Sequence, residues 1–190
     1  MTPASKISSS HFASDHRTVK RLFELREWTI SDAQSLAKHA NNKNVWKFLR
    51  DSFPSPYSLA DAESFIMTVL EKSGPPVDFA IEVEGEAAGG IGIILQNDVD
   101  RGCAEIGYWL GEAHWNKGIM TQVLKEISEY AFAHFTIHKI FATAFSFNTA
   151  SQKVLEKAGF EKEAVLKQAA IKNNQICDVL YYSLFQKNNP

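Results

Sequence analysis

One short stretch of the chain has residue types and spacing that suit phosphate binding. Residues 115–121 hold Lys117 and Gly118 side by side, ahead of a run in which apolar residues recur at three- and four-residue steps. That recurrence is typical of an amphipathic helix, so the glycine stands at a helix start. A helix N-terminus offers unpaired backbone N–H groups and a partial positive charge. The turn therefore predicts a phosphate or pyrophosphate site, although most short glycine-containing turns only connect a strand to a helix.

Three further polar residues stand in or beside predicted elements. The run 103–110 reads as a strand, and on it Glu105 shares one face with Gly107 and Trp109. A carboxylate on the same strand face as a glycine and a tryptophan lies either on an exposed part of a sheet or in a cleft. Asn148 and Ser151 stand at the start of a later helix, where Asn148 is a good N-cap.

The elements that must position these groups alternate between strands and helices. Residues 77–96 switch to a period of two around a tight turn at Gly85, which is typical of a hairpin. Ser31 is a plausible N-cap for the first helix, and Ser58 with Asp61 has capping-box spacing for the second. Together they predict an α/β (α+β) domain with a mixed sheet flanked by helices. The expected order is strand 21–28, helix 31–40, helix 58–72, hairpin 77–96, strand 103–110, a helix after residue 118, strand 138–147, helix 148–158 and hairpin 163–185.

Composition sets the broad class. The 190 residues are 45% hydrophobic with a net charge of −2, and no apolar run reaches membrane-spanning length. The basic residues are scattered and do not form the cluster that nucleic-acid binding requires, and the histidines do not have the spacing of metal ligands. The two cysteines, Cys103 and Cys177, are expected to be reduced, and no secretory signal is found, so we expect a cytoplasmic protein. Residues 1–18 predict a flexible polar tail and 19–190 a single domain.

Four segments, in this order and spacing, resemble a known family: residues 25–33, 104–110, 115–120 and 148–160. They resemble the GNAT superfamily of acetyl-CoA-dependent N-acetyltransferases, and look most like the branch that includes the ribosomal-protein N-terminal (alanine and serine) acetyltransferases. The resemblance implies a mainly antiparallel sheet of about seven strands, splayed between strands 4 and 5, with about four helices.

The resemblance also implies roles for the residues. Acetyl-CoA is the co-substrate and no metal is needed. The pantetheine arm lies between strands 4 and 5, Glu105 accepts the proton of an amine, and Ser151 protonates the leaving sulfur. The implied cofactor contacts are Tyr108, Trp109, Leu110, Trp115, Asn116, Lys117, Gly118, Ile119, Met120, Thr121 and Asn148.

Two positions depart from the family pattern. Met120 stands where the pyrophosphate loop often has glycine or alanine, and Leu155 stands where many members have a tyrosine general acid. A tyrosine acid at position 155 is therefore excluded, and Ser151, one turn earlier, is the nearest hydroxyl.

Each of these residues also has a structural interpretation. Glu105 can pair across strands, Asn148 and Ser151 can cap a helix, and Lys117 can be a solvated surface lysine. Three aromatic residues in the first third of the chain can line an acceptor site or belong to the core: Trp28, Trp46 and Tyr57.

The predicted function is acetyl transfer from acetyl-CoA to a primary amine. The acceptor is a protein N-terminus, such as that of a ribosomal protein, or a small amine such as a polyamine, an aminoglycoside or an amino acid. A non-catalytic acyl-CoA-binding regulatory module on the same fold is the alternative. Nothing indicates nucleic-acid or membrane partners, and the protein is expected to be a monomer or a homodimer.

Overall fold

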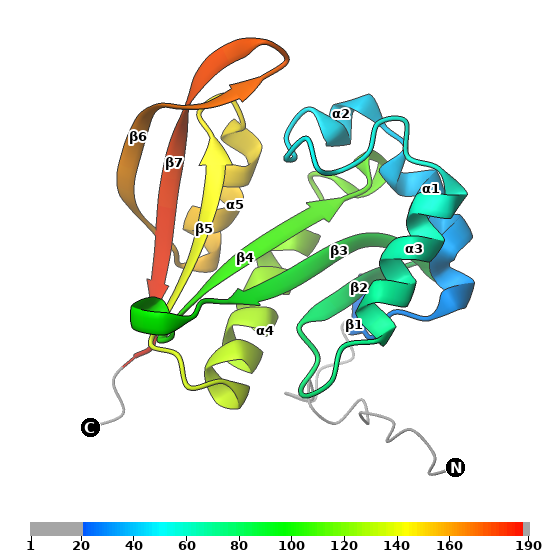
Figure 1. The fold of residues 1–190 in the computed structure, drawn as a ribbon, viewed down its shortest axis with the longest axis horizontal. Coiled ribbons are helices and arrows are strands. Elements are labelled where there is room, and N and C mark those ends of the chain that lie inside the picture. Colours follow the sequence, from blue (N-terminus) through cyan, green and yellow to red (C-terminus); the bar gives the residue numbers. More distant parts are fainter. Residues whose placement is uncertain (1–20, 188–190) are drawn as a thin grey trace.

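The computed structural model describes residues 21–187, so the tail predicted at residues 1–18 lies outside the described part. Its centre is a seven-stranded sheet in the order β1-β2-β3-β4-β5-β7-β6 (Figure 1). Neighbouring strands are antiparallel except β4 and β5, which are parallel, so the predicted mixed, mainly antiparallel sheet is confirmed. The strands are β1 (Glu24–Arg26), β2 (Asp78–Val83), β3 (Glu86–Leu95), β4 (Cys103–Leu110), β5 (Lys139–Phe145), β6 (Glu161–Lys172) and β7 (Gln175–Phe185).

Five α-helices lie within the described residues, one more than the four expected. The additional one, α2, is a single turn between the two helices expected at residues 31–40 and 58–72. It forms because the Asn42 side chain caps it, accepting a hydrogen bond from the Asn44 N–H at 2.7 Å. The helices are α1 (Ala33–Ala40), α2 (Lys43–Trp46), α3 (Leu59–Leu70), α4 (Ile119–His134) and α5 (Thr149–Ala158).

Helix ends follow the predicted capping with one exception. The Ser58–Asp61 capping box is present at α3, and Gly159 ends α5 in the left-handed conformation with φ 97°. The predicted N-cap Ser31 is wrong, because a 3-10 turn over Ile30–Asp32 precedes α1 and makes Asp32 its N-cap.

Helices pack on both faces of the sheet and bury two apolar clusters. In Figure 1, α4 and α5 lie behind the sheet, while α1 and α3 cover the part made by β1 to β3. The apolar stripe predicted for α4 is buried in full. On α5, Leu155 and Ala158 are buried, whereas Ala150 in the first turn is exposed.

The parallel pair β4–β5 is short. Three residue pairs join the strands, the last of them Glu105 with Phe141, and β4 continues to Leu110 and β5 to Phe145 without further pairing. Figure 1 shows the two strands diverging toward their C-terminal ends. We call the unpaired part of these strands, residues 106–110 and 142–145, the β4–β5 opening. The predicted splay between strands 4 and 5 is confirmed.

The tip of the β6–β7 hairpin reaches across to the segment around α2. The Lys172 ammonium lies 2.6 Å from Asp51 Oδ1 and 3.5 Å from the ring centroid of Trp46. Its side chain is only 1% exposed, so this ion pair and cation–π contact are shielded from water on the lysine side. The hairpin and the α2 segment are thereby joined, although they are far apart in the sequence.

Candidate active site

The turn ahead of α4 has the geometry of an anion site. Gly118 is the N-cap, with φ 76°, and the first hydrogen bond of the helix runs from the Gln122 N–H to the Gly118 carbonyl at 3.4 Å. The N–H groups of residues 119–121 therefore have no acceptor inside the helix. A Cβ on Gly118 would meet no atom within 4 Å, so the space above the helix end is open. Lys117 is exposed beside it.

The side chains of this turn divide into exposed and buried ones. Asn116, Lys117 and Gly118 face solvent, whereas Ile119 and Met120 are 1% and 8% exposed and belong to the core under the sheet. Only the backbone of Ile119 and Met120 can therefore meet a ligand. The methionine that departs from the family pattern fills core space and leaves the backbone surface of the turn free.

Trp115 anchors the turn to the end of β4. Its indole Nε1–H donates to the Leu110 carbonyl at 2.7 Å, and its ring lies 6.4 Å from that of Phe48, centroid to centroid. Phe48 also lies 6.1 Å from Phe147, which follows β5. One aromatic ring from the α2 segment therefore contacts both sides of the β4–β5 opening.

The backbone of β4 alternates between β3 and the opening. The Gly111 N–H donates to Ala88 on β3, so the Leu110 carbonyl in the same peptide unit points away from β3. Because strand residues alternate in direction, the backbone groups of Tyr108 also point into the opening, whereas the Trp109 carbonyl points to β3 at Gly89. The predicted cofactor contacts from Tyr108 and Leu110 have the required direction; any contact from Trp109 must come from its side chain.

Glu105 lies at the point where the two strands separate. Its carboxylate accepts a hydrogen bond from Arg50 Nη2 at 2.8 Å, and the Glu105 side chain is 19% exposed while that of Arg50 is 72% exposed. On the same face, Tyr181 stacks on Phe141 at 4.9 Å. Burial, and then the neighbouring Glu163 carboxylate, raises the pKa of Tyr181 to about 12. Glu105 is thus a partly buried carboxylate whose one ion-pair partner in the described chain is exposed.

Ser151 lies on the opposite face of the sheet, with Tyr108. The Tyr108 hydroxyl and Ser151 Oγ are 2.7 Å apart. The Asn148 side chain accepts a hydrogen bond from the Ser151 N–H at 3.1 Å, so Asn148 caps α5 as its structural interpretation required. Leu155 is fully buried, so the position of the family tyrosine faces the core.

Burial corrects two of the three predicted acceptor residues. Trp28 is 2% exposed and Tyr57 is 6% exposed, and both belong to the core between the sheet and helices α1 and α3, so neither has surface for an acceptor. Trp46 is partly exposed, but Lys172 covers its ring and its indole N–H donates to the Phe53 carbonyl at 2.9 Å.

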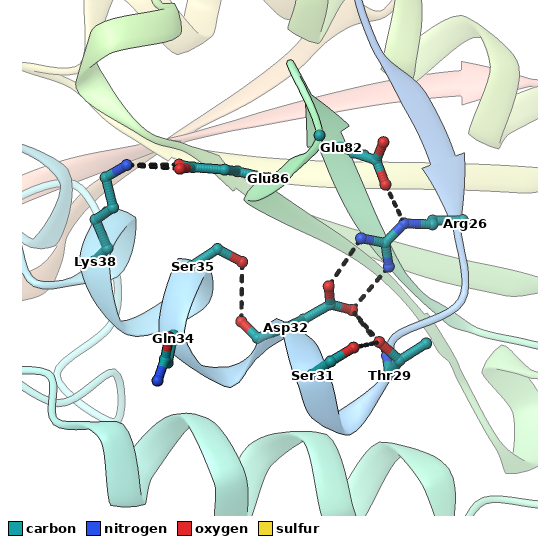
Figure 2. A pocket seen from close by; sticks show the side chains of 10 residues that line it. Arg26, Thr29, Ser31, Asp32, Gln34, Ser35, Lys38, Glu82 and Glu86 are labelled. Carbon is teal, nitrogen blue, oxygen red and sulfur yellow. Dashed lines mark hydrogen bonds and ion pairs between the residues drawn. The ribbon is translucent and has the colours of Figure 1, made fainter.

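A polar hollow lies away from these residues. A polar hollow of about 620 Å³ sits between β1, β2 and α1 (Figure 2). Its central charges are satisfied, because Arg26 donates to both Asp32 oxygens, at 2.7 and 2.8 Å, and to Glu82. Burial opposes the ionised form of Asp32, but the bonds from Arg26 and Thr29 outweigh it and hold the pKa of Asp32 below its usual value. These groups form a structural network, and the hollow contains none of the predicted site residues.

Sequence reasoning missed two partners in the site. Arg50 is 55 residues from Glu105, and Tyr108 is 43 residues from Ser151. The alternation of β4 did place Tyr108 on the face opposite Glu105, but nothing local in the sequence indicated that its hydroxyl meets α5.

Other chemistry is not indicated by residues 21–187. They hold no group of three side chains able to bind a metal ion, and both Cys103 and Cys177 are free. In the same residues no helix has the length and apolar character needed to cross a membrane.

The fold places an open helix start beside two diverging parallel strands. A model of the acetyltransferase (GNAT) domain matches residues 22–161, and the chain belongs to this family. The predicted enzyme class is confirmed: the protein is a GNAT N-acetyltransferase, and acetyl-CoA is its co-substrate.

Relatives agree with this assignment. The ribosomal-protein-serine acetyltransferase of Escherichia coli (strain K12) is 30% identical over 173 residues, which cover 82% of this chain and 95% of the relative. The uncharacterized N-acetyltransferase p20 of Bacillus licheniformis is 28% identical over 165 residues, covering 86% and 92%. A solved structure of the microcin C7 self immunity acetyltransferase MccE, in complex with acetyl-CoA and AMP, shares the fold with a TM-score of 0.77 at 23% identity, covering 93% and 99%.

Substitution of Gly118 tests the anion site. In Gly118→Ala the added Cβ enters the open space above the helix end, and we expect coenzyme A to bind about tenfold or more weakly, a loss of about 1.4 kcal/mol. The measurement is calorimetric binding of coenzyme A, with the ligand-induced rise in melting temperature as a second readout.

Gly74→Ala is the matched control. Gly74 also has a positive φ, of 95°, and open space around its Cβ, but it lies in the turn after α3. In both variants an alanine must adopt a positive φ, so the conformational free energy lost is similar. Equal coenzyme A affinity in the two would therefore contradict the assignment of the turn before α4 as an anion site.

Proposed function

We propose that the protein transfers the acetyl group of acetyl-CoA to the N-terminal amine of a protein or peptide, by direct attack within a ternary complex. The observation that carries the proposal is the convergence on one opening in the sheet. An unpaired strand edge, a carboxylate and a hydroxyl pair meet there, and an anion-binding helix start adjoins it.

The donor is proposed to lie in the β4–β5 opening. The N–H groups of residues 119–121 and the Lys117 ammonium suit a pyrophosphate. The backbone of Tyr108 faces the opening, so an extended pantetheine arm can pair with β4 as an added strand would. The thioester then lies near Glu105, where the two strands begin to separate.

The acceptor is proposed to approach from the face that carries Glu105. Gly107 is exposed on that face, two residues along β4, and a Cβ there would meet no atom within 4 Å. An amine in this open space is well placed to give up its proton to Glu105, directly or through a water molecule. Arg50 must first leave the carboxylate, which costs little because exposed ion pairs contribute only about 0–1 kcal/mol.

A peptide N-terminus is favoured over a small amine for two reasons. The sheet face beside Glu105 carries apolar and aromatic side chains, Ile94 and Phe141, in register with it on the neighbouring strands, which suits an extended peptide. The relative that is 30% identical over 82% of this chain is a ribosomal-protein-serine acetyltransferase.

An acceptor panel tests this proposal. Thiol release from acetyl-CoA is followed with short peptides that begin with serine or alanine, with the same peptides blocked at the N-terminus, and with spermidine, an aminoglycoside and free amino acids. We expect turnover with the unblocked peptides and acetylation of the α-amine by mass spectrometry. Turnover confined to small amines would show that the acceptor is a small amine and not a peptide N-terminus. Coenzyme A binding without any turnover would favour the non-catalytic alternative.

Glu105→Gln tests the proposed base through pH. General bases contribute about 10²–10⁴-fold, so we expect kcat to fall by about 100-fold near neutral pH while coenzyme A binding is unchanged. The defect should shrink as the pH rises past the pKa of the peptide amine, about 8, because the amine is then already neutral. Glu129→Gln, on the exposed side of α4, serves as the control. A defect of the same size at every pH would remove the role of Glu105 as base.

Gly107→Val tests the direction of approach. Valine is favoured in strands and its side chain meets open space, so the free energy of unfolding and coenzyme A binding should stay unchanged. Kinetics with the best peptide should show kcat/KM lower by about tenfold or more, or about 1.4 kcal/mol, because the side chain occupies the acceptor's position. Unchanged peptide kinetics would place the acceptor on another face.

A further inference from the structure

Tyr108 and Ser151 form a hydroxyl pair that the sequence did not reveal. Tyr108 comes from β4 and Ser151 from the first turn of α5, and their oxygen atoms are 2.7 Å apart. The pair therefore joins the two elements that border the β4–β5 opening, on the face opposite Glu105.

The 2.7 Å separation fits either hydroxyl as the donor, and the surroundings favour Tyr108. Each hydroxyl has one proton to donate. Tyr108 packs against the apolar cluster under α4 and α5, and within residues 21–187 Ser151 is the partner found for its hydroxyl. Ser151 is partly exposed at the helix start. With Tyr108 as the donor, its proton goes to Ser151 Oγ and the Ser151 proton is free to point outward.

We infer that Tyr108 is a positioning residue, which turns the hydroxyl proton of Ser151 toward the sulfur of the departing coenzyme A. This inference rests on the proposed function, because it places the thioester in the β4–β5 opening. A serine hydroxyl without this partner rotates freely, and its proton faces the sulfur only part of the time.

The chemistry of the step balances without another reactant. The amine nitrogen forms a bond to the acetyl carbon, the carbon–sulfur bond breaks, and its electron pair remains on sulfur. The amine proton passes to Glu105 and then to solvent. Ser151 stabilises the thiolate by hydrogen bonding, a charge-assisted bond, and the thiolate takes a proton from solvent.

Electrostatics keep Tyr108 in its donor form. Burial raises the pKa of the Tyr108 hydroxyl, the bond to Ser151 lowers it in part, and nearby Tyr182 raises it again. Tyr108 therefore stays neutral and protonated at physiological pH. The partial positive charge at the start of α5 favours a thiolate at the same place.

The test measures the pKa of the thiol of bound coenzyme A. The ultraviolet absorbance of the thiolate is titrated against pH in the wild type, in Tyr108→Phe, in Ser151→Ala and in the double variant. Tyr182→Phe is the matched control, because it removes another buried hydroxyl bonded to α5, at Glu156, without touching Ser151.

We expect the thiol pKa of bound coenzyme A to lie below that of the free cofactor in the wild type. Tyr108→Phe and Ser151→Ala should each raise it by about one unit, and the double variant should go no further than Ser151→Ala alone. In transfer assays Tyr108→Phe should lower kcat by about tenfold with KM for acetyl-CoA unchanged.

The outcomes separate this inference from the proposed function. An unchanged thiol pKa in Tyr108→Phe, or an equal shift in Tyr182→Phe, would overturn the role of Tyr108 even if acetyl transfer is observed. The titration needs no acceptor, so a wrong acceptor class leaves it valid. Failure of the wild type to bind coenzyme A would remove both proposals.

Discussion

The short parallel pairing of β4 and β5 is the constraint on which the site depends. Each strand is held on its other side by a longer antiparallel ladder, β4 by seven residue pairs with β3 and β5 by seven with β7. Because those ladders fix the strands in diverging directions, the three pairs between β4 and β5 cannot extend. The unpaired backbone edge is therefore part of the folded state, and no hydrogen bonds between β4 and β5 have to break for a ligand to reach it.

This opening also separates the two kinds of polar group. Glu105 lies on one face of the sheet and the Tyr108–Ser151 pair on the other, because alternate strand residues point to opposite faces. A carboxylate and a hydroxyl that faced each other directly would bond to one another. Held on opposite faces, each can meet a different atom of a ligand that lies between them.

The spacing of apolar and polar residues in the sequence made much of this architecture predictable. Period-two alternation placed Glu105 and Gly107 on one face of β4, and the three- and four-residue steps of α4 identified its buried side. Partners distant in sequence were not predictable, since no local pattern ties Arg50 to Glu105. Aromatic residues were ambiguous for another reason: core and ligand walls both favour them, and Trp28 proved to be core.

The contact between Lys172 and the α2 segment has a topological consequence. Arg50 and Asp51 are adjacent in the chain; one holds Glu105 on β4 and the other holds the hairpin that leads back through β7 to β5. These contacts close a ring around the face of the sheet that carries Glu105. The ring opens whenever Arg50 leaves the carboxylate, and the Lys172–Asp51 contact then still ties the α2 segment to the hairpin.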